Sequence, residues 1–261
     1  MEVLTQSEAF EEKDGDWVFS HTKVILRKGS QHYYALTVER QAANFDPAQL
    51  ECVRIPDEHI YPAASPTFLR APDPLPPNVY IKTPDLVTYG STPESSNVAA
   101  QTLQEIQICE ILRQHPHPNI AQYLGCLVTD NKIHGICFAK YKITLAEYLR
   151  NGYNLNVEQC LAGIERAVSH LHDLKLVHND LNPFNIMLDD NNEPILIDFD
   201  SCMYEGEELG LKGGTEGWAE HDIRTASFAN DIYGLAKIRE HLAAYDHHSL
   251  TRARPTKNVS E

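Results

Sequence analysis

One stretch, residues 178–200 (HNDLNPFNIMLDDNNEPILIDFD), constrains the fold and the chemistry of this chain more than any other. Its apolar run Pro194–Ile197 is typical of a strand that is covered on both faces. An acid, Asp198, follows that run directly, and the preceding loop carries a second carboxylate, Asp180, and an amide, Asn185. Phosphoryl transfer needs such a set: a carboxylate that orients the hydroxyl nucleophile, and oxygen ligands for magnesium beside the phosphates.

Acids in loops are common, and each of these carboxylates alone would be interpreted as a solvated surface residue or a helix cap. Their order favours a different interpretation. The stretch contains H-x-D-L-x-x-x-N and then, after the apolar strand, D-F-x. This combination favours a phosphotransferase-type site over a surface loop that happens to precede a core strand.

The stretch resembles the protein kinase-like superfamily at two motifs. Residues 178–185 are similar to the catalytic loop of that family, and residues 198–200 are similar to its magnesium-binding D-F-G. The resemblance implies ATP and Mg²⁺ as cofactors and Asp180 as the catalytic base. It also implies that Asn185 and Asp198 hold the metal and, through it, the nucleotide.

Three positions depart from the family pattern. Asn179 stands where the family usually has arginine, Asn182 where serine/threonine kinases have lysine, and Asp200 where the motif has glycine. Without the arginine, a phosphate on the segment after the D-F-x motif has no obvious partner, so activation by that route is not expected. Asp200 adds a third acid near the metals, which either binds magnesium or repels the phosphates.

A lysine and a glutamate complete the site that the resemblance implies. Residues 78–82 resemble the V-A-I-K strand, which aims Lys82 at the α and β phosphates. Residues 96–114 have apolar positions at helical spacing, and Glu105 lies beside that apolar face. We therefore expect Glu105 to pair with Lys82, with Glu110 as the second candidate.

Two further segments would contact the nucleotide and the substrate. In the resemblance, the main chain from Ala139 to Tyr141 hydrogen-bonds adenine. The G-T-x-x-W sequence at residues 214–218 resembles the loop that receives a peptide's acceptor residue, and its Thr215 is expected to contact Asp180. A glycine-rich turn without function is the alternative interpretation.

The N-terminal third is less regular. Residues 1–16 are acidic and polar and are expected to be unstructured, whereas residues 17–38 predict a β-hairpin around Gly29. That hairpin lacks the G-x-G-x-x-G pattern that lets backbone N–H groups approach phosphate. Residues 56–93 carry nine of the fifteen prolines. We expect them to be extended but packed, because apolar residues are interspersed among the prolines.

Helices are predicted in the second half of the chain, over residues 144–151, 156–173 and 228–242. Asp231 lies beside the apolar face of the last of these. A buried carboxylate there needs partners, and the resemblance implies that it anchors the catalytic-loop backbone. His178 is expected to be a packed, hydrogen-bonded core residue and not an acid or base.

Composition restricts the partners. The formal charge of −15 argues against sequence-independent binding to nucleic acid or to an anionic membrane. The six cysteines have no paired metal-ligand spacing, so reduced core thiols are expected. No secretory leader and no membrane-spanning run is recognisable, which predicts a cytoplasmic or nuclear protein.

The sequence therefore predicts an α+β, bilobal, protein kinase-like fold with a small β-rich N-lobe and a helical, C-terminally truncated C-lobe. The expected parts are residues 1–16 (disordered), 17–139 (N-lobe), 140–245 (C-lobe) and 246–261 (polar tail). The predicted function is ATP- and Mg²⁺-dependent phosphoryl transfer to a protein serine or threonine hydroxyl. Two alternatives stay open: a catalytically weak pseudokinase that binds or scaffolds a partner, and a small-molecule kinase of the aminoglycoside or choline kinase type.

Overall fold

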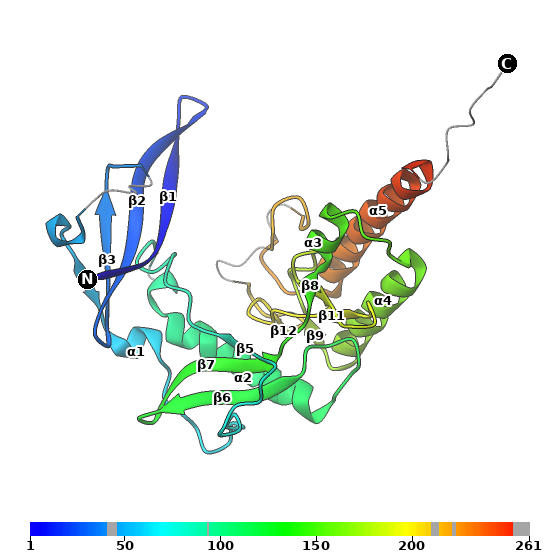
Figure 1. The fold of residues 1–261 in the computed structure, drawn as a ribbon, viewed down its shortest axis with the longest axis horizontal. Coiled ribbons are helices and arrows are strands. Elements are labelled where there is room, and N and C mark those ends of the chain that lie inside the picture. The colour runs from blue at the N-terminus through cyan, green and yellow to red at the C-terminus, as the bar shows by residue number, and fades with distance from the viewer. Residues whose placement is uncertain (41–45, 93, 210–213, 221–222, 253–261) are drawn as a thin grey trace. The chain divides into compact units, whose positions relative to one another are not determined.

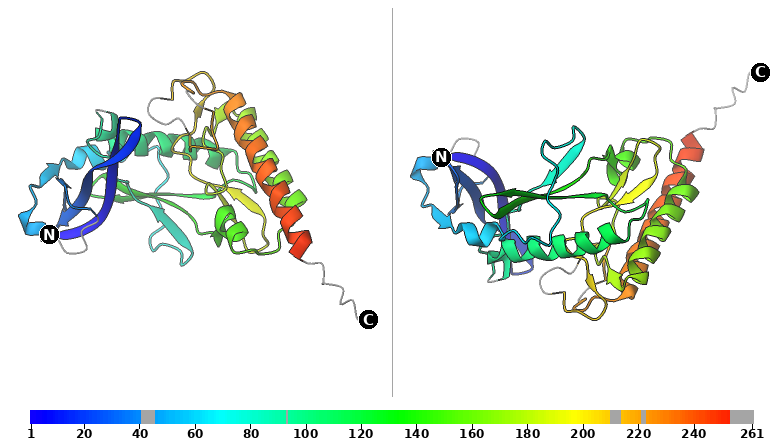
Figure 2. Two further views of the ribbon diagram at one scale, coloured as in Figure 1. Left: turned by 90° about the horizontal axis from the view of Figure 1, so that it is seen from above. Right: turned by 90° about the horizontal axis from the view of Figure 1, so that it is seen from below.

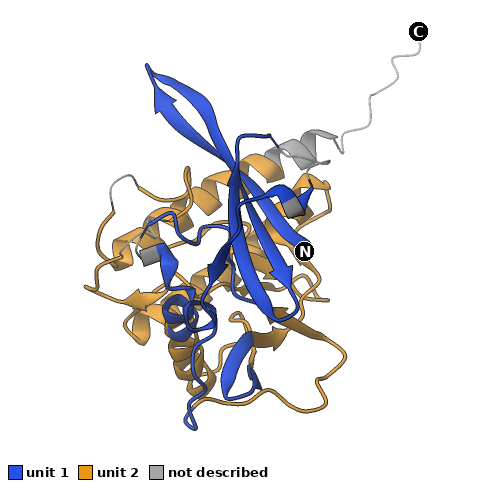
Figure 3. Ribbon diagram, turned by 90° about the vertical axis from the view of Figure 1, so that its left-hand side faces the viewer, with its two compact units in different colours: residues 1–67, 82–103, 126–135 blue, residues 68–81, 104–125, 136–261 orange. Residues whose placement is uncertain are grey.

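A computed structural model describes residues 1–40, 46–92, 94–209, 214–220 and 223–252 (Figure 1). The chain divides into two units, and each is described by itself (Figure 3). Unit 1 comprises residues 1–67, 82–103 and 126–135, and unit 2 comprises residues 68–81, 104–125 and 136–261. This division falls inside the region that the sequence predicts as one small lobe.

A four-stranded antiparallel sheet forms most of unit 1, in the order β1-β2-β3-β4. Its strands are β1 (Glu2–Lys13), β2 (Asp16–Lys28), β3 (Gln31–Thr37) and β4 (Val53–Ile55). Neighbouring residues of β2 point to opposite faces, as the period of a strand requires. Val24 and Leu26 pack with Ala35 on one face, while Ile25 packs with Ile55 and other buried residues on the opposite face.

The structure differs from the expectation that residues 1–16 are unstructured. Strand β1 pairs with β2 along its whole length, from Glu2 opposite Arg27 to Lys13 opposite Asp16. The turn between them is Asp14-Gly15, where both residues have positive φ, 55° and 86°. Asp-Gly is the sequence most typical of a tight hairpin turn. This turn sequence favours a hairpin even though the residues of β1 are mostly polar.

The proline-rich segment is ordered, as expected. Helix α1 (Asp57–Ile60) begins directly after Pro56, and Ile133 donates its N–H to the carbonyl of Pro62 within unit 1. Further along, within unit 2, the Leu69 N–H donates to the buried Glu110 carboxylate at 2.6 Å. Groups outside the segment therefore pair backbone donors and acceptors that the segment does not pair internally.

Three strands form a second sheet, in the order β5-β7-β6, and the unit boundary passes through it. They are β5 (Val79–Lys82), β6 (Tyr123–Thr129) and β7 (Lys132–Ala139). Helix α2 (Val98–Gln114) occupies the range in which a helix is predicted. Short 3₁₀ turns lie at Pro47–Gln49 and Glu94–Ser96.

Unit 2 is built on two long helices that lie side by side, α4 (Val157–Asp173) and α5 (Phe228–Arg252) (Figures 1 and 2). A capping box between Thr144 and Glu147 begins the shorter α3 (Leu145–Arg150), and the Asn156 side chain caps α4. Short strands carry the loops between the helices. They are β8 (Ile143–Thr144), β9 (Leu176–Val177), β10 (Ile186–Leu188), β11 (Pro194–Leu196) and β12 (Met203–Tyr204).

Helix α5 is longer than its apolar pattern predicts. It continues past Leu242 to Arg252, so residues 246–252 of the expected polar tail are helical, and residues 253–261 lie outside the described residues. Ala243 and Ala244 favour the helical state, and the Tyr245 hydroxyl donates to the Tyr153 carbonyl at 2.5 Å. None of the described helices is long and apolar enough to cross a membrane.

Glu110 ties the proline-rich segment to α2, which yields a first prediction. Its carboxylate accepts from the Leu69 N–H, the Tyr123 hydroxyl and the Arg113 guanidinium. Replacing it (Glu110→Ala) removes a charged acceptor from three donors, so the free energy of unfolding in urea should fall by about 2 kcal/mol. The exposed Glu158→Ala on α4 should change it by less than about 0.5 kcal/mol. Equal effects would contradict this role for Glu110.

The cysteines yield a second prediction. Five are buried, as the sequence predicts, and only Cys52 is half-buried. Burial, with a smaller contribution from Glu193, raises the pKa of Cys160 to about 12, and burial also raises the pKa of Cys202. Because the thiolate is the reactive form, a disulfide reagent should modify Cys52 first, and the other thiols only after denaturant is added. Mass spectrometry of the labelled peptides checks the order, and early labelling of Cys160 would contradict it.

Candidate active site

One buried carboxylate anchors the backbone of the loop that follows β9. Asp231 on α5 accepts the backbone N–H of His178 and that of Asn179, both at 2.9 Å, and the Nε2 of His172 at 2.9 Å. Its side chain is 0% exposed. A charge so buried is stable only when it is paired and hydrogen-bonded. The anchoring contact that the sequence predicts for Asp231 is present.

His178 is fixed in one tautomer. Its Nδ1 accepts the N–H of Asp180 at 3.3 Å, so Nε2 carries the proton and donates to the Ile197 carbonyl at 3.0 Å. The ring is fully buried and lies edge-on against the ring of Phe199, with the two ring centres 5.8 Å apart. His178 therefore acts as a structural bridge between the loop and the end of β11, which confirms its predicted packed role.

The carboxylate of Asp180 is the centre of the site. Its Oδ1 accepts both the N–H and the hydroxyl of Thr215, at 2.8 and 2.7 Å, and an N–H of the Asn182 amide at 3.0 Å. Its Oδ2 accepts from the Asn185 amide at 2.8 Å. The expected contact between Thr215 and Asp180 is thus present, and four neutral donors orient the carboxylate.

Asn182 connects more of the site than the sequence alone indicates. Its amide also donates to the Thr215 hydroxyl at 3.2 Å, while its Oδ1 accepts the N–H groups of Phe184 and Asn185 at 2.9 and 3.2 Å. The side chain is 1% exposed. The sequence indicated only that lysine was missing here. The signal that could have revealed the role is the N-P-F-N sequence, in which an asparagine can accept from the backbone two residues on.

Asn179, the second asparagine in place of a cation, is also fully engaged. Its amide donates to the carbonyls of Val177 and Ser201, and its oxygen accepts from the Asn230 amide. The residue has φ +65°, in the left-handed region that asparagine tolerates better than most residues. The loop is therefore stabilised by uncharged hydrogen bonds where a guanidinium would otherwise lie.

Two glycines allow the chain to approach this loop closely. A Cβ on Gly234 of α5 would lie 2.8 Å from the Leu181 Cβ and 2.9 Å from its carbonyl oxygen. A Cβ on Gly214 would lie 2.9 Å from the Asn179 carbonyl oxygen, and Gly214 also has φ +82°. Larger residues at either position would displace the loop. Sequence reasoning did not single out Gly234.

One backbone hydrogen bond connects the two segments that carry Asn185 and Asp198. The N–H of Ile197 donates to the Asn185 carbonyl at 3.0 Å, which brings the residue before Asp198 next to Asn185. Asp198 is half-buried with φ +64°, and Ser201 donates to Asp200 at 3.0 Å. In the described part of the chain no group of three or more His, Cys, Asp or Glu side chains could hold a metal ion. Magnesium in phosphoryl-transfer sites takes one or two protein oxygens and completes its shell from phosphates and water, so this donor set fits it.

The remaining predicted residues are spread over both units. Lys82 ends β5 in unit 1, and the buried Glu105 lies on the part of α2 that belongs to unit 2. Their pairing therefore stays a prediction. The runner-up, Glu110, has the three partners described above. The Ala139 N–H donates to the Gln122 carbonyl at 2.9 Å, so an adenine contact at this residue would use its carbonyl.

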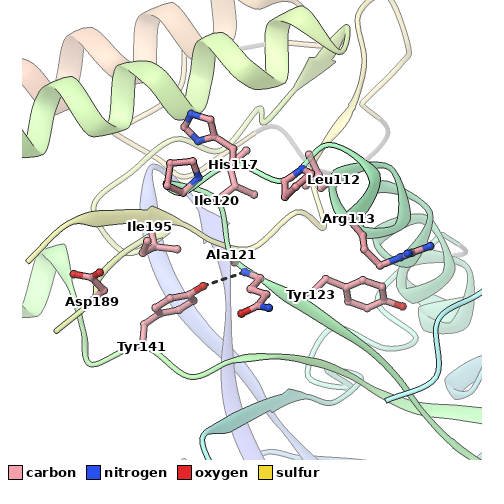
Figure 4. A pocket seen from close by; sticks show the side chains of 12 residues that line it. Leu112, Arg113, His117, Ile120, Ala121, Tyr123, Tyr141, Asp189 and Ile195 are labelled. Carbon is pink, nitrogen blue, oxygen red and sulfur yellow. Dashed lines mark hydrogen bonds between the residues drawn. The ribbon is translucent and has the colours of Figure 1, made fainter. Parts of the chain in front are cut away.

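Tyr141 lines a cavity of about 590 Å³ in unit 2 (Figure 4). Its hydroxyl accepts the N–H of Gln122 at 3.0 Å, and burial raises the pKa of the phenol. Asp189 and Ile195 form the wall beside it, and Leu112 and Arg113 at the end of α2 form another wall. Asp180, Asn185 and Asp198 do not line this cavity, so it is separate from the catalytic loop.

Comparison with known proteins agrees with the geometry. A family model described as "Protein kinase domain" matches residues 87–219. Mitogen-activated protein kinase kinase kinase 1a of Physcomitrium patens is 32% identical over 135 residues, which cover 48% of this chain and 18% of that protein. The liver/testis isoform of the phosphorylase b kinase gamma catalytic chain of Bos taurus is 30% identical over 152 residues, 56% of this chain and 37% of that protein. The chain thus spans well under half the length of these relatives.

The bridging role of Asn182 yields a third prediction. Replacing it (Asn182→Ala) removes the side-chain acceptor of the Phe184 and Asn185 N–H groups, and the Asn185 N–H keeps its bond to the backbone carbonyl of residue 182. We expect the free energy of unfolding to fall by about 1–3 kcal/mol and amide hydrogen exchange at these two residues to accelerate. Asn191→Ala, at an exposed position in the turn before β11, serves as the matched control. Unchanged exchange at Phe184 and Asn185 would contradict the role.

Proposed function

Because the chain belongs to the protein kinase superfamily, we propose that it transfers the γ-phosphoryl group of Mg²⁺·ATP to a serine or threonine hydroxyl of a protein. The observation that carries this proposal is the Asp180 carboxylate, which accepts a hydroxyl hydrogen bond at 2.7 Å from Thr215. A carboxylate that is oriented to accept from a hydroxyl is the group that phosphoryl transfer to an alcohol requires.

Each side chain has a defined part in this proposal. Asp180 orients the acceptor hydroxyl and takes its proton, while the amides of Asn182 and Asn185 keep the carboxylate in position. The side-chain oxygens of Asn185 and Asp198 hold magnesium. When bound, the metal ion neutralises charge on the phosphates. Lys82, paired with Glu105 in a bilobal arrangement, grips the α and β phosphates, and the main chain at Ala139 and Tyr141 contacts adenine.

A protein substrate is favoured over a small molecule by the loop at Thr215. This residue joins the G-T-x-x-W segment directly to Asp180 through two hydrogen bonds. A peptide laid against that segment would place its hydroxyl next to the carboxylate. Serine and threonine are favoured because one of the similar proteins, samkC of Dictyostelium discoideum, is named a probable serine/threonine-protein kinase.

The asparagine at 182 has a consequence for the rate. A neutral amide orients Asp180 but brings no positive charge to the transferred phosphoryl group, so the metal and Lys82 must neutralise more of it. We therefore expect turnover that depends steeply on magnesium concentration.

A fourth prediction tests the function. Wild-type protein should phosphorylate serine or threonine peptides on an array with labelled ATP, and Asp180→Asn should reduce the rate by at least about a hundredfold. Mg²⁺·ATP should still raise the thermal stability of Asp180→Asn, since ligand that binds the folded state stabilises it. Asp198→Asn should abolish that rise. Asp190→Asn, exposed in the turn before β11, is the matched control and should behave as wild type.

Three outcomes would contradict this proposal. Nucleotide binding without turnover would make the protein a pseudokinase, for which Asp200 and the missing glycine-rich loop are the sequence features. Phosphorylation of aminoglycosides or choline, but not of peptides, would make it a small-molecule kinase. No thermal shift at saturating Mg²⁺·ATP would leave a binding module of kinase fold.

A further inference from the structure

Unit 1 contains a cavity of about 370 Å³ that no part of the proposed phosphotransferase site uses. Strands β1, β2 and β3, the end of α1, the segment 83–86 and His134 on β7 form its walls. All of these residues belong to unit 1. Its volume lies in the range of cavities that hold small ligands, about 300–1,000 Å³.

One side of the cavity is apolar and aromatic. Ile25, Ile60 and Leu86 line it and belong to one cluster of buried residues. Beside them the rings of Tyr61 and His134 are tilted by 37° with their centres 4.2 Å apart. Apolar side chains next to a pair of rings suit a flat aromatic ligand.

The cavity is also lined by a buried side chain, next to Tyr61, that has a nitrogen without a hydrogen-bond partner. His32 is 9% exposed, and its Nδ1 is buried and makes no hydrogen bond within the protein. Of the buried side-chain atoms without a partner in the described residues, only this one belongs to a residue that lines the cavity. A buried ring nitrogen without a partner destabilises the protein, and a ligand that hydrogen-bonds to it removes that cost.

His32 is uncharged at neutral pH. Burial lowers the pKa of its imidazole, and the nearby Arg27 lowers that pKa further. A neutral imidazole has one nitrogen that donates and one that accepts. With the proton on Nδ1, the ring offers the ligand a donor.

Arg27 lies next to His32 on the same face of the sheet. The two residues are direct cross-strand partners of β2 and β3, and Glu2 of β1 is the partner of Arg27 on its other side. The Arg27 Nη2 donates to the Glu2 carboxylate at 2.8 Å, and both side chains are about half exposed. A surface ion pair of this kind contributes little, so a ligand carboxylate can replace Glu2 at small cost. Guanidinium groups bind carboxylates with two parallel hydrogen bonds.

We propose that this cavity binds a small aromatic carboxylic acid, with its ring on the Tyr61 side and its carboxylate between Arg27 and His32. The proposal is independent of phosphoryl transfer. It requires neither ATP nor the catalytic loop, and it assigns a ligand to the N-terminal sheet.

Benzoate is the probe for the fifth prediction. Titrated into the ¹⁵N-labelled full chain, it should shift amide signals of β2, β3 and α1, with the same shifts when Mg²⁺·ATP is present. Benzamide has the same shape without the charge and should bind at least tenfold more weakly. Arg27→Gln and His32→Phe should each weaken benzoate binding at least tenfold, the latter because it keeps the ring but removes the nitrogen.

Arg40→Gln is the matched control, because Arg40 is an exposed arginine of unit 1 that pairs with a glutamate, Glu8, and does not line the cavity. Its affinity for benzoate should equal that of wild type. No shifts up to the solubility limit of benzoate, equal losses in Arg27→Gln and Arg40→Gln, or equal affinities for benzoate and benzamide would each overturn the proposal. Arg27 is half exposed, so its variant should fold and remains decisive even if His32→Phe does not.

Discussion

The catalytic loop depends on the buried carboxylate of Asp231. A charge that is 0% exposed is costly unless every oxygen has donors, and here two backbone N–H groups and one imidazole supply them. These donors come from the loop at His178 and Asn179 and from α4 at His172. One side chain on α5 therefore connects both long helices with the loop that presents Asp180.

The loop above this anchor is organised by amides. Asn179 and Asn182 stand where arginine and lysine are usual in the family, and both are nearly fully buried. Each donates hydrogen bonds to several partners, so these bonds stabilise the geometry around Asp180 without a positive side chain. Neutral groups orient Asp180, and in the proposed mechanism the metal ion and Lys82 would supply the positive charge.

Much of this site could be predicted from sequence, because its motifs are contiguous and chemically distinctive. The contacts of Thr215 with Asp180, and of Asp231 with the loop backbone, follow from the kinase resemblance and are present. The bridging by Asn182 was not predicted, since it depends on a three-dimensional neighbour, Thr215, that lies far along the chain. Gly234 was not singled out for the same reason: only the packed structure shows that Leu181 fills the space beside it.

Secondary structure was predictable wherever a periodic apolar pattern existed, as for α2 and α4. Strand β1 was not, because its residues are mostly polar and its main determinant is the two-residue turn Asp14-Gly15. The cavity beside Arg27 and His32 was equally invisible in the sequence. It arises from the register of β2 and β3, which the residue pattern alone does not specify.

Amide hydrogen exchange in Asp231→Asn is the most direct test of the central claim, that this carboxylate organises the catalytic loop. The asparagine keeps one acceptor oxygen, so its NH2 group would face either the Asn179 N–H or the His178 N–H, a donor against a donor. We therefore expect exchange at His178 and Asn179 to accelerate at least about a hundredfold, corresponding to a loss of about 3 kcal/mol. Exchange at Val24 and Ala35 in the sheet of unit 1 should stay unchanged and serves as the internal reference. Unaltered protection at His178 and Asn179 would contradict the account.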